Sequence, residues 1–295
     1  MVAPAPGTQT TRADLAGWAS MTTQAISIPG GRMEAFTLLG GTGIPLVVLG
    51  GIETGMRPLA GTEQVLRRRW EGRAAARGVT VLGRPIPDDP ADAERIMHPR
   101  VIADGIATTL RAVGLGPVGI EAESGGGRIS LWLTVDHPEL VSRLVLASVA
   151  SETPPDSPMT ERMSQWIDLA EKGAWGEFFG RMAVQMKPAG SVKADAFAGA
   201  AQLQPKPATP ERFIGELKAT LDPSSFVTDR LGEVSVPTLV LAGGQDQVVP
   251  PASSRLVAER IRGARFELDP DSGHTVRSSF SGYDQLVEAF LAAGD

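Results

Sequence analysis

The sequence lacks cysteine entirely and has only three histidines among its 295 residues. Without cysteine there can be no disulfide, thiolate metal site or cysteine nucleophile. With only His98, His137 and His274, a polyhistidine metal site is not expected, and neither is any other cofactor. No apolar run approaches the roughly 18 residues of a membrane span, and the amino-terminal stretch has no continuous apolar segment. These absences predict a cytoplasmic protein without membrane contact.

Basic charge is also scarce, because 28 lysines and arginines stand against 34 aspartates and glutamates, for a net charge of -6. Such a chain creates no positive field to hold a phosphate backbone, so nucleic acid is not an expected partner. Hydrophobic residues make up 42% and charged residues 21%, which is close to the average of folded domains with one sizeable core. A small-molecule substrate is the expected partner, and composition leaves the oligomeric state open.

From about residue 24 the chain alternates short β-branched runs with amphipathic stretches, which is an α/β pattern. We predict eight strands, over 25–28, 33–39, 44–50, 79–83, 117–123, 143–148, 237–243 and 264–269. The first two are separated by a Pro-Gly-Gly-Arg turn and predict an antiparallel hairpin, whereas the others read as parallel strands covered on both faces. Helices are expected from Thr62 to Gly78, over 101–114, from Ser124 to His137 and over 283–294.

The rhythm changes between residues 151 and 235, where four helical patterns replace the strands. The chain is therefore divided into a loose start (1–23), a sheet domain (24–150 and 236–295) and a helical cap (151–235). The cap is rich in methionine and aromatic residues, which either fill its own core or form an apolar roof over a substrate. The candidate pocket residues are Trp166, Trp175, Phe178, Phe179 and Met182.

A serine stands at the most informative point of the chain. The predicted strand ends at Glu123, Ser124 follows, and the small residues Gly125 and Gly126 lead directly into a helix. So sharp a reversal strains the backbone at the turning residue, and small neighbours let strand and helix approach each other. Free N–H groups at the start of the helix, Gly125 being the nearest, can stabilise a developing negative charge. Nucleophile and charge-stabilising donors are thus expected together at Ser124.

Three motifs together resemble the α/β-hydrolase superfamily, in particular its capped single-domain serine hydrolases of the esterase and lactonase type. The segment 122–126 (AESGG) is similar to the nucleophile elbow of that family, 240–250 (VLAGGQDQVVP) to the loop that carries the triad acid, and 270–274 (PDSGH) to the loop that carries the base. The resemblance covers roughly residues 24–293. It implies an eight-stranded, mostly parallel sheet with helices on both faces and a helical cap after strand six.

The resemblance also implies the site residues. Ser124 would be the nucleophile, Asp246 the acid and His274 the base, in the chain order that this fold uses. Because some members of the superfamily carry the acid after strand six, Glu152 is the alternative to Asp246. His98 and His137 are expected at capping or surface positions.

The second oxyanion donor is implied at Ile52, with Gly51 beside it, in a loop where the family usually has His-Gly and this chain has Gly-Gly. A simple glycine-rich turn is the alternative. Two acids near the expected site are unusual. Glu53 neighbours this loop, and Glu123 directly precedes the nucleophile. We interpret Glu123 as a hydrogen-bonded supporting group; if ionised and unpaired, it would oppose oxyanion formation.

These residues predict a serine hydrolase that cleaves an ester, lactone or thioester of a small apolar or aromatic molecule through an acyl-enzyme on Ser124. Serine at the turn argues against dehalogenases and epoxide hydrolases, which use aspartate there. Acyl transfer or C–C bond cleavage by the same triad remains open. So does a noncatalytic small-molecule receptor on a hydrolase scaffold, and a purely structural module is the least favoured alternative.

Overall fold

The computed structural model describes residues 23–188, 191 and 194–293. The loose start expected over 1–23 lies, except for Thr23, outside the described residues. Thr23 is tied to the first long helix, because its hydroxyl donates a hydrogen bond of 2.9 Å to Glu63.

One sheet organises the described chain, with the strand order β1-β2-β4-β3-β6-β7-β8-β9 and β5 paired to β2. The strands are β1 (Gln24–Ile28), β2 (Gly31–Thr42), β3 (Leu46–Leu49), β4 (Arg77–Leu82), β5 (Ile86–Pro87), β6 (Val118–Glu123), β7 (Val141–Ala147), β8 (Thr238–Gly243) and β9 (Arg265–Asp269). β2 runs antiparallel to its neighbours, whereas β4, β3, β6, β7, β8 and β9 are parallel. The carboxyl ends of these parallel strands therefore share one edge, where open α/β sheets bind ligands.

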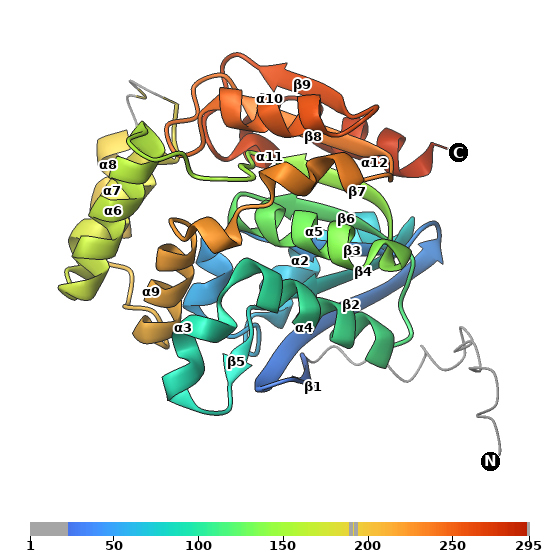
Figure 1. The fold of residues 1–295 in the computed structure, drawn as a ribbon, viewed down its shortest axis with the longest axis horizontal. Helices are drawn as coiled ribbons and strands as arrows, with labels where there is room; N and C mark the ends of the chain where they lie inside the picture. The colour runs from blue at the N-terminus through green and yellow to red at the C-terminus, as the bar shows by residue number, and fades with distance from the viewer. Residues whose placement is uncertain (1–22, 189–190, 192–193, 294–295) are drawn as a thin grey trace.

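Helices cover both faces of the sheet (Figure 1). One face carries α4 (Pro99–Ala112), α5 (Gly125–Asp136) and α10 (Pro251–Arg260), and the other carries α2 (Glu63–Ala74) and α12 (Tyr283–Ala292). The short elements are η2 (Ile52–Met56), η3 (Pro90–Asp92), α3 (Ala93–Ile96), η4 (Pro138–Leu140), η5 (Pro223–Ser225), η6 (Thr228–Glu233) and α11 (Val276–Ser279). No helix in the described part of the chain has the length and apolar character of a membrane span.

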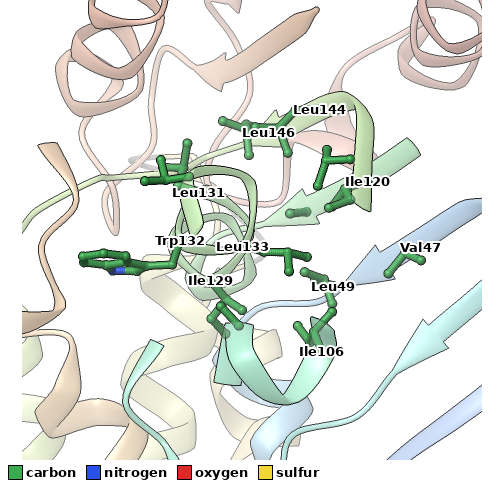
Figure 2. Packing of buried hydrophobic residues seen from close by; sticks show 14 of the residues in the cluster. Val47, Leu49, Ile106, Ile120, Ile129, Leu131, Trp132, Leu133, Leu144 and Leu146 are labelled. Carbon is green, nitrogen blue, oxygen red and sulfur yellow. The ribbon is translucent and has the colours of Figure 1, made fainter. Parts of the chain in front are cut away.

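The continuous apolar strands supply both layers of the core. In β3, Val47 and Leu49 belong to the cluster under α4 and α5, while Leu46 and Val48 belong to the cluster under α2 and α12. Figure 2 shows the first cluster, in which Ile106 of α4 lies close to strand residues such as Leu49. Because successive strand side chains point to opposite faces, only strands apolar at every position can be covered on both sides.

A buried carboxylate interrupts this apolar pattern. Glu121 of β6 faces the α2 and α12 side and is 2% exposed. It accepts hydrogen bonds from Arg73 of α2, from Arg277 of α11 and, at 3.0 Å, from the Tyr283 hydroxyl of α12. One acid thus ties three helices to the central strand, and its burial is compensated by two guanidinium groups.

Four helices follow β7, and we call them the cap helices. They are α6 (Pro158–Glu171), α7 (Trp175–Gln185), α8 (Ala194–Ala201) and α9 (Pro210–Ala219). In Figure 1, α6, α7 and α8 stand together to one side of the sheet, while α9 lies closer to it. Val227, Leu231 and Val234, which follow the cap helices, pack into the main cluster under α4 and α5.

The structure confirms the predicted fold class and differs in detail. All eight predicted strands are present, and the additional β5 is too short for a periodic signal. α2 ends at Ala74, not at Gly78, because β4 starts at Arg77. Helix α10 was not predicted, although its start, Pro250-Pro251, carries the proline signal of a first helical turn.

The start of α5 lies against the end of β3 with almost no space between them. A Cβ atom added to Gly126 would lie 2.4 Å from the carbonyl oxygens of both Leu49 and Gly50. One added to Gly127 would lie 2.1 Å from Val149 Cγ1. Only glycine permits this approach of backbone to backbone. The approach fixes the position of Ser124, which directly precedes α5.

We expect Gly126→Ala to destabilise the fold by about 1–3 kcal/mol, because its methyl group meets backbone rather than a flexible side chain. The control is Gly72→Ala in α2, where an added Cβ meets nothing within 4 Å. It should stabilise the protein by about 0.5–1 kcal/mol. Urea denaturation measures both, and wild-type stability in Gly126→Ala would contradict the expected clash.

Candidate active site

Three side chains converge at the carboxyl edge of the sheet. The Oγ atom of Ser124 lies 2.9 Å from Nε2 of His274, and Nδ1 of His274 lies 2.8 Å from Oδ2 of Asp246. Ser124 follows β6, Asp246 follows β8 and His274 follows β9. The structure therefore brings together the three residues that the motifs single out, in one hydrogen-bonded chain.

The turn at Ser124 exposes its hydroxyl through strained backbone. Its φ of 53° and ψ of -123° lie outside the regions that most residues adopt. The Ser124 N–H donates to the carbonyl of Ala147 in β7 at 2.9 Å, which anchors the turn to the sheet. The strain is held by the packed helix that follows, as expected of a functional turn.

Hydrogen bonds fix the acid and the base. Oδ1 of Asp246 accepts from the N–H groups of Val248 and Val249 at 2.8 and 2.9 Å, which leaves Oδ2 for the imidazole. The Ser148 hydroxyl donates to the carbonyl of His274 at 2.8 Å. Glu152, the alternative acid, instead lies near the guanidinium of Arg128, where its charge partly offsets the lowering of that arginine's pKa by burial.

The imidazole of His274 is buried, with 2% of the residue exposed. Burial alone lowers the pKa of His274, but the charge and hydrogen bond of Asp246, followed by the charges of Glu123 and Glu53, outweigh it. The net shift raises the pKa above the ordinary value of 6.5. Because Nδ1 faces a carboxylate, the neutral ring carries its proton there, and Nε2 is the atom that accepts from Ser124.

Two backbone N–H groups lie close to Ser124. Gly125 begins α5 and Ile52 begins η2, and a Cβ atom added to Gly125 would lie 3.6 Å from the Ile52 nitrogen. Within the described residues, neither N–H is donated to an acceptor. The loop and the helix start thus present two adjacent donors, at the positions implied for an oxyanion hole.

Arg84 orients one of these donors, a role that the motifs did not reveal. Its Nη2 atom donates to the carbonyls of Gly50 and Gly51, each at 3.0 Å. In a trans peptide the C=O and N–H groups point in opposite directions, so a guanidinium that holds the Gly51 carbonyl turns the Ile52 N–H away from itself. Arg84 is held in turn by Glu216 of α9, with Nε and Oε1 2.7 Å apart.

The two unusual acids differ in their surroundings. Glu53 accepts the Gly51 N–H at 3.1 Å and so helps to shape the loop. Glu123 has no hydrogen bond or ion pair among the described residues, contrary to the hydrogen-bonded role that we expected. Burial, then the charge of Glu53, raises the pKa of Glu123. The raised pKa favours the neutral acid, which limits repulsion of an oxyanion.

A cavity opens above Ser124, between the sheet edge and the cap helices. Its walls are mostly apolar, and the lining residues are Ile52, Glu53, Met97, Pro99, Ile102, Ser124, Gly125, Arg128, Ile129, Ala150, Thr153, Met159, Met163, Trp166, Met182, Met186, Glu216, Thr220, Val248, Val249 and His274. Methionines from three different segments contribute, and their flexible side chains suit an irregular apolar ligand.

Of the five candidate pocket residues, Trp166 and Met182 line this cavity. Trp175, Phe178 and Phe179 do not; they pack edge-on and tilted against one another inside the cap, with ring centroids 5.2 to 6.3 Å apart. The reason is that four cap helices need a core of their own, and the largest rings supply it. Among the described residues no group of three or more His, Asp or Glu side chains is arranged to hold a metal ion.

Comparison with known proteins connects this geometry to a family. Residues 103–276, more than half of the chain, match the family model described as serine aminopeptidase, S33. The chain is 25% identical over 271 residues to 2-hydroxymuconate semialdehyde hydrolase of Pseudomonas sp. (strain CF600), covering 86% of this chain and 89% of the relative. It is 26% identical over 201 residues to pimeloyl-[acyl-carrier protein] methyl ester esterase of Neisseria meningitidis serogroup B, covering 65% and 74%.

Solved structures share the fold. The α/β hydrolase MGS-M2, from a Medee basin deep-sea metagenome library, superposes with a TM-score of 0.75 at 15% identity, over 92% of this chain and 98% of that one. At such low identity the likeness concerns the fold alone.

The three histidines allow a direct test of the site's electrostatics. We expect the pKa of His274 to lie above 6.5 because of Asp246. We expect the pKa of His98 to lie below 6.5, because burial is the largest influence on His98 and lowers its pKa. Asp246→Asn should lower the pKa of His274 and leave that of His98 unchanged, as measured by NMR titration of the imidazole resonances. A His274 pKa unaffected by this substitution would show that Asp246 does not control the ring.

Proposed function

The chain belongs to the α/β-hydrolase superfamily, in the family described as serine aminopeptidase, S33, and from this premise we propose that it is a serine hydrolase that cleaves an ester, lactone or thioester through an acyl-enzyme on Ser124. The observation that carries the proposal is the pair of hydrogen bonds that joins Ser124, His274 and Asp246. His274 is 28 positions from Asp246 and 150 positions from Ser124 in the chain. The three residues nevertheless meet, with the order of donors and acceptors that nucleophilic catalysis needs.

Acylation follows from these contacts. The Ser124 hydroxyl attacks the substrate carbonyl carbon as its proton passes to Nε2 of His274. The carbonyl oxygen becomes an oxyanion and accepts the N–H groups of Ile52 and Gly125. When the tetrahedral intermediate collapses, the leaving alkoxide or thiolate takes the proton from Nε2, and an ester joins the acyl group to Ser124.

Deacylation repeats the steps with water as the nucleophile. Nε2 accepts a proton from the attacking water, the same N–H groups stabilise the second oxyanion, and Ser124 regains its proton as the acid leaves. Asp246 stabilises the imidazolium in both half-reactions and holds its ring in place, while remaining ionised itself.

The cavity wall supports a small apolar or aromatic substrate, because most of its lining side chains are methionine, isoleucine, valine or tryptophan. Two relatives are named as a methyl ester esterase and a semialdehyde hydrolase. The first name favours ester chemistry. The second keeps C–C bond cleavage as an alternative outcome, alongside acyl transfer to an acceptor other than water.

We expect Ser124→Ala and His274→Ala each to lower kcat by about a thousand-fold to a million-fold, because the triad acts as a unit. Asp246→Asn should lower kcat by about ten-thousand-fold, since the imidazole loses its fixed tautomer. The losses are measured as rates of hydrolysis, and products are identified by mass spectrometry to separate the reaction types. The substrates are 4-nitrophenyl esters, lactones, thioesters, diketones and an amino-acyl 4-nitroanilide.

A fluorophosphonate probe provides the control for folded protein. It should label the wild type and spare Ser124→Ala, while thermal unfolding of the two remains alike. A folded wild type that resists labelling would favour a noncatalytic receptor. Retained turnover in Ser124→Ala would defeat the proposal.

A further inference from the structure

A buried arginine lines the cavity above Ser124. Arg128 is one helical turn beyond Ser124, and residues four apart lie on the same face of a helix. The residue is 6% exposed. Two of its hydrogen-bond partners, Thr153 and Thr220, line the same cavity, so the guanidinium head and not only the stem lies at the cavity wall.

The partners of Arg128 are all neutral. Nε donates to the carbonyl of Ala150 at 3.3 Å, Nη1 donates to the carbonyl of Thr220 and the hydroxyl of Ser225 at 3.0 and 3.1 Å, and Nη2 donates to the Thr153 hydroxyl at 3.0 Å. These four bonds leave one N–H of Nη2 undonated, since a guanidinium carries five. Among the described residues, no carboxylate oxygen lies within 4.0 Å of this head.

Among the described residues, the lack of a direct ion pair sets Arg128 apart from Arg84. Arg84 is equally buried but forms an ion pair with Glu216 at 2.7 Å. Burial lowers the pKa of Arg128 to about 10, and the charge of Glu152 opposes this from a distance. A buried charge without a direct ion pair is costly, so a ligand group that neutralises the charge of Arg128 is bound favourably.

We propose that Arg128 is the binding site for an anionic group of the substrate, with a carboxylate as its chemical form. This inference rests on the proposed function and narrows it to esters or lactones whose acyl part carries a carboxylate beyond a short apolar spacer. The reacting carbonyl lies at Ser124, and the carboxylate is held by the free N–H of Nη2. The methionines and Trp166 surround the spacer.

The negative groups of the cavity agree with this orientation. Glu53 lines the part near the oxyanion donors and repels a carboxylate from that end, whereas the charge of Glu216 there is paired with Arg84. A substrate with one apolar and one anionic end is therefore bound in a single direction. A neutral substrate of the same shape lacks this preference.

A purely structural role for Arg128 is the competing explanation, because its bonds to Ala150 and Thr220 join α5 to the chain around the cap helices. Arg212 of α9 provides the matched control. It is 2% exposed, donates to the carbonyls of Pro85 and Gly55 and has no carboxylate partner within 4.0 Å, but it does not line the cavity.

The test compares two probes that differ only in charge, monomethyl adipate and the methyl ester of adipamic acid. Binding is measured by calorimetry on Ser124→Ala, so that no turnover intervenes. We expect the acid to bind at least about tenfold more tightly than the amide, as for hydrogen bonds to a charged group. Ser124→Ala combined with Arg128→Gln should abolish this preference, and with Arg128→Lys should keep part of it.

Ser124→Ala combined with Arg212→Gln should keep the whole preference. The proposal is overturned if the acid binds no better than the amide, including no binding of either, or if Arg128→Gln retains the preference while thermal unfolding shows a folded protein. Hydrolysis of a neutral 4-nitrophenyl ester by the wild type is scored separately. Its absence would count against the proposed function and would leave the binding comparison valid.

Discussion

The close contact between the start of α5 and the end of β3 is the constraint on which the site depends. Gly126 lies against the carbonyls of Leu49 and Gly50, so strand and helix meet with no side chain between them. This contact keeps Ser124 in its strained turn and places Gly125 beside Ile52, because both donors belong to the two segments in contact. The catalytic hydroxyl and the oxyanion donors are thus products of one backbone packing arrangement.

Much of this was predictable from the sequence, for a physical reason. Ser124, Asp246 and His274 each follow a short apolar strand, and parallel strands of one sheet must end at a common edge. The strand pattern therefore placed the three residues at one edge, while the resemblance to the α/β-hydrolase superfamily implied their roles. The fold class followed from the same alternation of strands and amphipathic stretches, and a two-residue strand such as β5 left no periodic signal to detect.

What could not be predicted depends on contacts between distant segments. Arg84 and Glu216 are 132 residues apart, and nothing in their local sequence indicates that either is buried. The cap shows the same limit. Trp166 and Phe178 both occupy apolar helix faces, yet one lines the cavity and the other fills the cap's core. Periodicity identifies a buried face but not which of two apolar neighbours covers it.

The Arg84–Glu216 pair has a mechanical consequence. Arg84 donates hydrogen bonds to the carbonyls of Gly50 and Gly51, which orient the Ile52 N–H. Glu216 of α9 holds Arg84 in place through an ion pair. Displacement of α9 from the sheet would expose a buried ion pair and release the peptide plane beside the nucleophile. The position of α9 is therefore coupled to the geometry of the reaction centre, whereas α6 and α7 contribute only methionine and tryptophan side chains to the cavity wall.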